Sequence, residues 1–165
     1  FPYTTLFRSF TITAMSNDKV RVDMAKMCSE QLKAHGISVK AEARKELDWE
    51  NQDATIIGWG SPFDADDHTY KIFTSEAGDN YTGYANPAVD EALAKARATT
   101  NESERQRYYS EFLSAMTKQM PYTFIAYIDA DYAVKKNIKG ITKDTMLGHH
   151  GVGIFWNVAE WKLEK

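Results

Sequence analysis

Four residues that could do acid–base or metal chemistry stand close together in the first half of the chain. They are three carboxylates and an imidazole, Asp64, Asp66, Asp67 and His68. Such groups transfer protons and ligate transition metals. Three interpretations are open: an Asp turn that hydrogen-bonds to itself, direct contact with a ligand, or a metal centre. The corresponding enzyme hypothesis is a metal-dependent hydrolase that uses Asp64, Asp66 and His68 together with His149.

The spacing of these residues does not favour a metal or a catalytic centre. Counted from Asp64, an EF-hand loop would need glycine where Thr69 stands and glutamate where Ser75 stands. The sequence contains no Gly-x-Ser-x-Gly elbow and no phosphate-binding glycine loop, and its one cysteine, Cys28, falls on the apolar stripe of an expected helix. We therefore expect no metal, no cofactor and no catalytic residue, and interpret the chain as a non-enzyme.

A ligand-binding loop is better indicated. Residues 54–59 form a short apolar run that ends in Trp59 and is followed by Gly60 and Pro62, which is typical of a buried strand that ends in a loop. The loop then offers a hydroxyl, a phenyl ring and carboxylates, a mixture that suits a binding site.

Composition limits the partners. The chain has 165 residues, 43% of them hydrophobic, which suffices for one sizeable core. Its net charge of −3 comes with no basic run that could follow a phosphate backbone, so nucleic acid is not an expected partner. No apolar run reaches the roughly 18 residues that a membrane-spanning helix requires.

The first nine residues are set apart from the fold. Residues 1–9 read, codon for codon, as the translation of a common sequencing adapter, and we interpret them as a scar. On this interpretation the true N-terminus, with any signal peptide, is absent.

The elements expected around the loop alternate between strand and helix. Residues 10–15 and 37–43 alternate as half-buried strands, and between them a helix of about 18 residues should run from the cap at 16–18 to Gly36. With the strand at 54–59, this order predicts an α/β fold in which a mixed sheet, parallel in part, is flanked by helices.

The second half is expected to be mainly helical at first. Residues 64–84 read as an irregular excursion with one helical turn near 70–73. Helices should begin at Asn86-Pro87 and at Asn101, the second running to Met120. Residues 122–128, and a shorter stretch at 132–134, have the composition of strands.

Several segments together resemble a known family. They are Asp53-Ala-Thr-Ile-Ile-Gly-Trp59, the stretch from Asn80 to Asp90, and Asn137-Ile-Lys-Gly-Ile141. Their order and spacing are similar to the C-terminal lobe of the extracytoplasmic solute-binding proteins of ABC importers, in the peptide/nickel (dipeptide- and oligopeptide-binding) family. The resemblance covers residues 10–165.

The resemblance implies one lobe of a two-lobe, type II periplasmic-binding-protein-like fold. Residues 10–133 would form the C-terminal lobe, and residues 134–165 would cross back to an N-terminal lobe that is missing here but present in cis. It further implies an extracytoplasmic protein, periplasmic or lipid-anchored, which hands its solute to ABC permease subunits and meets the membrane only through them or through an anchor.

The resemblance also implies which residues contact the solute. They are Trp59, Gly60, Ser61, Phe63 and Asp64 in the loop, with Trp49 as a further aromatic. Similar peptide binders place an aspartate three residues after the tryptophan, where this chain has Pro62. A peptide or similar small solute is the expected cargo, and an oligosaccharide or a nickel complex is the alternative within the family.

Overall fold

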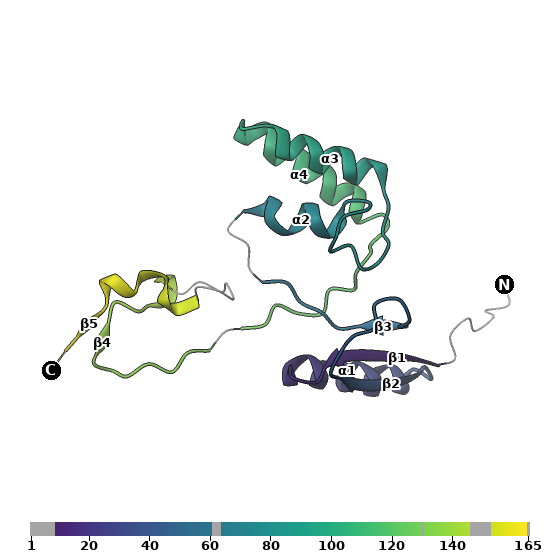
Figure 1. Cartoon of the computed structure of the whole chain (residues 1–165), viewed down its shortest axis with the longest axis horizontal. Helices are drawn as coiled ribbons and strands as arrows, with labels where there is room; N and C mark the ends of the chain where they lie inside the picture. The colour runs from purple at the N-terminus through teal and green to yellow at the C-terminus, as the bar shows by residue number, and fades with distance from the viewer. Residues whose placement is uncertain (1–8, 61–63, 130, 146–152, 165) are drawn as a thin grey trace. The chain divides into compact units, whose positions relative to one another are not determined.

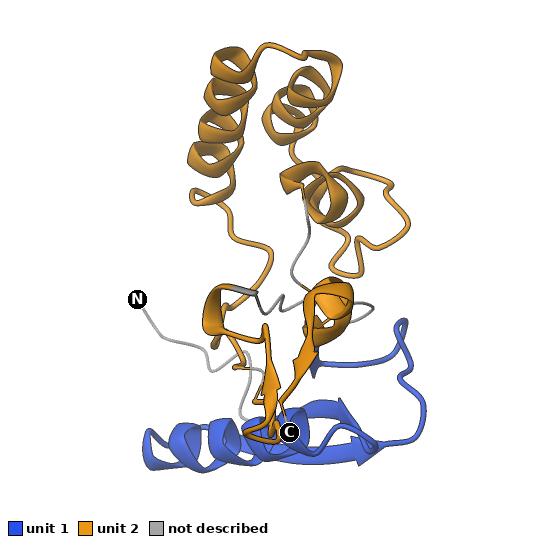
Figure 2. Cartoon of the chain, turned by 90° about the vertical axis from the view of Figure 1, so that its left-hand side faces the viewer, with its two compact units in different colours: residues 1–58 blue, residues 59–165 orange. Residues whose placement is uncertain are grey.

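Apolar and β-branched residues at the start of the chain build a parallel sheet. The computed structural model describes residues 9–60, 64–129, 131–145 and 153–164, which fall into unit 1 (Phe1–Gly58) and unit 2 (Trp59–Lys165) (Figure 2). In unit 1, β1 (Ser9–Met15) pairs in parallel with β2 (Ser38–Arg44) and with β3 (Ala54–Thr55), in the order β2-β1-β3. The predicted α/β class and the parallel pairing are confirmed.

Helix α1 (Lys19–Ala34) connects β1 to β2, and both of its ends follow the local signals (Figure 1). Asp18 caps it by accepting a hydrogen bond from the Arg21 backbone N–H at 3.0 Å. Gly36 follows with φ +79°, the left-handed conformation that glycine adopts without strain. Ala25 packs into the core of unit 1, which contains Ile12, Ala14 and Ile56.

The sheet differs from the prediction in two details. Strand β1 was expected to be half-buried, but Thr13 is buried as deeply as Ile12 and Ala14 because β1 is the central strand. The Thr13 hydroxyl is satisfied there by the Ala54 carbonyl at 3.1 Å. The strand predicted at 54–59 is also shorter, since only Ala54 and Thr55 pair with β1.

Three helices form the core of unit 2: α2 (Ala65–Phe73), α3 (Pro87–Ala98) and α4 (Glu102–Met116) (Figure 1). Helix α3 packs against both α2 and α4. Leu93 and Val89 are fully buried in this core, and Phe112 of α4 lies against Phe73 of α2 with ring centroids 5.4 Å apart. Burying a side chain of this size stabilises the fold by roughly 1.5–3 kcal/mol.

The caps of α3 and α4 confirm their predicted starts, whereas α2 and the end of α4 were predicted wrongly. Asn86 and Asn101 each cap their helix through the side-chain oxygen. Helix α2 was expected to be a single turn but has nine residues, and α4 ends at Met116 rather than Met120.

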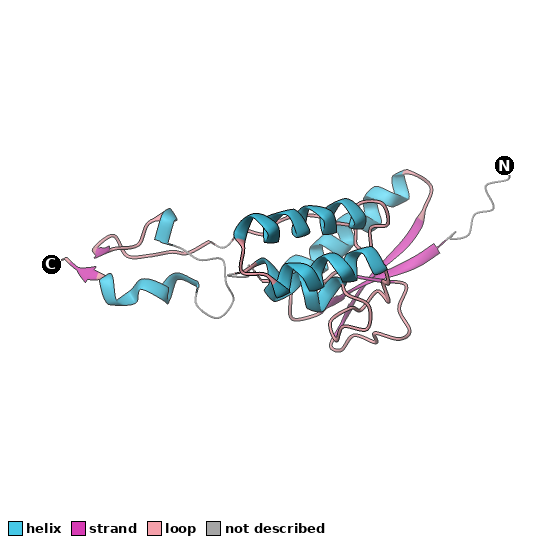
Figure 3. Cartoon of the chain, turned by 90° about the horizontal axis from the view of Figure 1, so that it is seen from above, coloured by secondary structure: helices cyan, strands magenta, loops and turns pink. Residues whose placement is uncertain are grey.

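The chain after α4 departs most from the predicted strands. Within the described residues, 122–128 and 132–134 form no strand, and Figure 3 draws 122–128 as loop. Further on, β4 (Ile138–Lys139) pairs antiparallel with β5 (Lys162–Leu163), next to the short 3₁₀ helices η1 (Lys143–Thr145) and η2 (Gly153–Glu160). Among the helices in the described ranges, none has the length and apolar character to cross a bilayer.

Candidate functional site

Trp59 lies in an aromatic cluster that the sequence did not reveal. Its indole stacks on the Tyr81 ring with centroids 6.0 Å apart and an interplanar angle of 5°. The His68 imidazole lies at 6.0 Å from the indole and is tilted by 48°. Such aromatic pairs add about 0.5–1.5 kcal/mol beyond the area they bury. Trp59 is thus held by two rings while 37% of its surface stays exposed.

Asp64 begins α2 and is paired with an arginine of α4. Its carboxylate accepts the Asp66 backbone N–H at 2.8 Å, as an N-cap does, and accepts two hydrogen bonds from the Arg105 guanidinium, of which Nη1 to Oδ2 measures 2.9 Å. The bonds from Arg105, followed by that from the Asp66 N–H, lower the pKa of Asp64 to about 2. The side chain is still 52% exposed.

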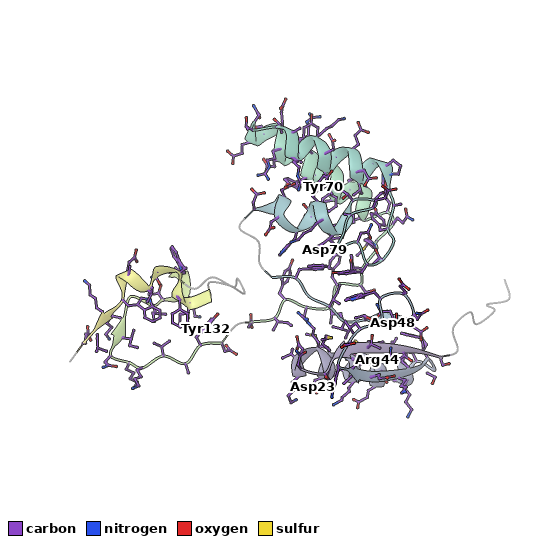
Figure 4. All side chains as sticks on the ribbon, viewed as in Figure 1. Asp23, Arg44, Asp48, Tyr70, Asp79 and Tyr132 are labelled. Carbon is purple, nitrogen blue, oxygen red and sulfur yellow. The ribbon has the colours of Figure 1, made fainter. Side chains whose placement is uncertain are left out.

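Asp66 makes a second pair of the same kind with α3. The Arg97 guanidinium donates to Asp66 through Nε, at 2.9 Å to Oδ2, and through Nη2, at 2.8 Å. The same guanidinium lies 3.6 Å from the centroid of the Tyr70 ring, which Figure 4 labels on α2. The Asp cluster bonds to itself, as one of the three interpretations expected, through the Asp66 N–H and Asp64. Its carboxylates also contact the arginines of α3 and α4.

The loop that carries Tyr81 is organised by Asn80. The Asn80 side-chain amide donates to the carbonyls of Thr74 at 3.0 Å and Tyr84 at 2.7 Å, and its oxygen accepts the Tyr84 backbone N–H at 3.1 Å. A second tie links the start of the loop to α3, where the Asp90 carboxylate accepts both the N–H and the hydroxyl of Ser75. The Asn- and Gly-rich composition indicated a loop, but nothing in its spacing connected Tyr81 with Trp59.

The remaining predicted site residues are placed as follows. Gly60 is half-buried next to Trp59, whereas Ser61 and Phe63 lie outside the described residues. Trp49 belongs to unit 1 and is 40% exposed. It follows Asp48, whose carboxylate accepts the backbone N–H groups of Glu50 and Asn51, both at 3.1 Å, and which Figure 4 labels. The ligand roles of these residues remain predictions.

The geometry gives no support to a metal-dependent hydrolase. In the described part of the chain, no three His, Cys, Asp or Glu side chains gather to hold a metal ion. The carboxylates of Asp64 and Asp66 are both engaged by arginines. His149, the fourth residue of that hypothesis, is outside the described ranges.

No family model matches the chain. Individual proteins of known sequence do match it. The chain is 28% identical over 169 residues to the oligopeptide-binding protein AppA of Bacillus subtilis, an alignment that covers 95% of this chain and 30% of AppA. It is 36% identical over 144 residues to protein XP55 of Streptomyces lividans, covering 81% of this chain and 26% of that protein.

Solved structures agree with the sequence relatives. The crystal structure of NikZ from Campylobacter jejuni in complex with Ni(L-His) superposes on this chain with a TM-score of 0.74 and 40% sequence identity. The match covers 93% of this chain and 33% of the NikZ chain. AppA from Bacillus subtilis, in complex with a nonapeptide, is 27% identical with a TM-score of 0.75 and matches 95% of this chain and 32% of its own. The chain thus spans about a third or less of the length of these proteins.

Proposed function

Because this chain is homologous to part of the peptide- and nickel-binding solute-binding proteins and shares their type II α/β fold, we propose that it forms one lobe of such a protein. It acts as the substrate-binding component of an ABC importer and catalyses no reaction. Residues 10–133 supply the C-terminal lobe, and residues 134–165 cross back to the other lobe. The place of action is extracytoplasmic, and the partners are the permease subunits.

At residue level, the proposal is supported by the indole of Trp59, which packs against the rings of Tyr81 and His68 and is still partly exposed. A rigid aromatic ring at a loop is suited to pack on a peptide or a similar small solute. Trp59 and Gly60 make the contact, together with Ser61 and Phe63, and Trp49 adds a further aromatic surface. Lobe closure then follows from the higher affinity of the solute for the closed form.

We also include Asp64 in the proposed site, although its charge is already paired with Arg105. Both of its carboxylate oxygens accept hydrogen bonds from Arg105. A cationic group of the solute would have to compete with that guanidinium. This makes Asp64 a weaker partner for a peptide ammonium group than an aspartate with no arginine beside it.

The experiment is a thermal-shift screen of the protein encoded by the longest reading frame that contains this sequence. The probes are a nonapeptide, a dipeptide, a maltooligosaccharide and the nickel–L-histidine complex. A probe at about 100 times its Kd should stabilise the protein by about 2.7 kcal/mol, a shift of a few degrees in Tm. A shift with one class supports the proposal and names the cargo, whereas no shift with any class contradicts it.

A further inference from the structure

Tyr81 and Trp59 form the flattest ring pair among the described aromatic contacts. Their planes differ by 5°, whereas the other aromatic pairs are tilted by 31° or more. A parallel, offset arrangement is one of the two geometries that aromatic quadrupoles favour. The contact therefore fixes the plane of the indole as well as its position.

Side-chain hydrogen bonds restrain the loop that carries Tyr81. Asn80, the residue before it, bonds back to Thr74 at the end of α2 and forward to Tyr84. Ser75 is tied to Asp90 in the first turn of α3, at 2.8 Å through its backbone N–H. The start of the loop is thereby tied to α3, and the Asn80 side chain links the two ends of the loop to each other.

The hydroxyl group of Tyr81 points to a partner other than Trp59. It donates to Asp79 Oδ1 at 3.3 Å, and Figure 4 labels Asp79 on the loop after α2. Burial, and then the charge of Asp79, raise the pKa of Tyr81, so the ring is neutral at physiological pH. The interaction with Trp59 is made by the ring face, to which the hydroxyl contributes little.

We propose that Tyr81 is a positioning residue of the solute site, whose ring sets the orientation in which Trp59 meets the solute. The proposal rests on the function proposed above and deepens it. It requires an aromatic ring at position 81 and does not require the hydroxyl. Tyr81 acts through Trp59, and it does not touch the solute itself.

The first test reads the indole without any solute. In the 165-residue chain, Trp49, Trp156 and Trp161 are replaced by Phe, so that Trp59 is the single indole. Tyr81→Leu should then increase acrylamide quenching and lower the anisotropy of Trp59, while Tyr81→Phe leaves both unchanged. Tyr127→Leu is the matched control because Tyr127 is fully exposed. Unchanged quenching and anisotropy in Tyr81→Leu, with the far-UV spectrum and Tm retained, would overturn the proposal.

The second test is a double-mutant cycle on affinity in the protein from the longest reading frame. The probe is whichever of the nonapeptide, the dipeptide, the maltooligosaccharide or nickel–L-histidine shifts the parent. Tyr81→Leu should weaken binding by up to about tenfold, and should have no further effect once Trp59→Ala is present. Tyr81→Phe should bind as the parent does.

The outcomes separate this proposal from the one it rests on. Independent, additive losses from Tyr81→Leu and Trp59→Ala mean that Tyr81 contacts the solute itself, which contradicts a positioning role. A loss in Trp59→Ala with none in Tyr81→Leu contradicts the positioning role alone. Full affinity in Trp59→Ala removes Trp59 from the solute site, and the proposed function then loses its residue-level basis. If no probe binds the parent, the acrylamide quenching of Trp59 in Tyr81→Leu still tests whether Tyr81 positions the indole.

Discussion

Arg105 of α4 holds Asp64 at the first turn of α2 through paired hydrogen bonds, and so joins two segments forty-one residues apart in the sequence. The same carboxylate caps α2 through the Asp66 N–H. One side chain therefore fixes the start of α2 both locally and against another helix. This start follows directly on the loop in which the solute contacts are proposed.

Replacement of Asp64 should separate these two roles. Asp64→Asn keeps a good capping oxygen but loses the charge, whereas Asp64→Ala loses both. Asp64→Ala should lower the free energy of unfolding by about 1–2 kcal/mol, and Asp64→Asn by less than about 1 kcal/mol, because an exposed ion pair contributes little. Urea denaturation of the 165-residue chain measures both values. Equal losses in the two variants would mean that the cap contributes nothing.

Because of the lowered pKa of Asp64, the free energy of unfolding should depend on pH in the acidic range. The pKa of Asp64 falls from 3.8 to about 2 on folding, chiefly through Arg105, so the folded state binds its proton less readily. Its stabilising contribution is complete above the unfolded pKa and is lost as the pH falls through the folded value. Between about pH 4 and pH 2 the parent should lose more stability than Asp64→Asn. Parallel losses in parent and variant over this range would contradict the assignment.

Local signals determined how much of the fold could be predicted. Asn86 with Pro87, Asn101 and Gly36 mark helix ends through their own backbone and side-chain chemistry, and these ends were predicted correctly. Helix α2 was missed although Asp64 is a good cap. Helix α2 has only nine residues, so its apolar pattern spans little more than two turns. Its Tyr70 and Phe73 pack against the core formed by α3 and α4, a long-range contact that the local sequence does not show.

Long-range contacts determined what could not be predicted. Residues 122–128 have strand composition, but a strand also needs a partner backbone, and within the described chain this segment has none. Thr13 is buried because β1 became the central strand, which the alternation of its own residues does not encode. At the candidate site, Trp59 was proposed from its place after a short strand. Its neighbour Tyr81 was not foreseen, because an irregular loop brings it there.

The helical core of unit 2 offers a prediction with a matched control. Leu93 is fully buried in α3, while Leu113 in α4 is 51% exposed. Leu93→Ala should lower the free energy of unfolding by about 2–5 kcal/mol through lost burial and the cavity left behind. The same substitution at Leu113 should change it by no more than about 0.5 kcal/mol. Denaturant midpoints of both variants test this, and similar midpoints would show that α3 and α4 do not pack as described.

Asn80 should be necessary for the loop that carries Tyr81. Asn80→Ala leaves the carbonyls of Thr74 and Tyr84 without their donor and should cost about 1–3 kcal/mol. Asn80→Asp should also destabilise, because it places an oxygen against both carbonyls. Asn51→Ala serves as the control, since Asn51 lies on an exposed turn and should change stability by less than about 0.5 kcal/mol. Faster hydrogen exchange at the Tyr84 amide in Asn80→Ala is the local readout, and unchanged exchange would contradict it.

The most direct test of the whole account is the affinity of the Trp59→Ala variant for the probe that stabilises the parent protein. Isothermal titration gives the Kd, and Trp156→Ala is the control, because that indole is 48% exposed and lies in η2, outside the proposed site. We predict that Trp59→Ala weakens binding about tenfold or more while its far-UV spectrum stays that of the folded parent, and that Trp156→Ala binds as the parent does. Equal affinity of Trp59→Ala and the parent would contradict the claim that this chain supplies a solute-binding surface through Trp59.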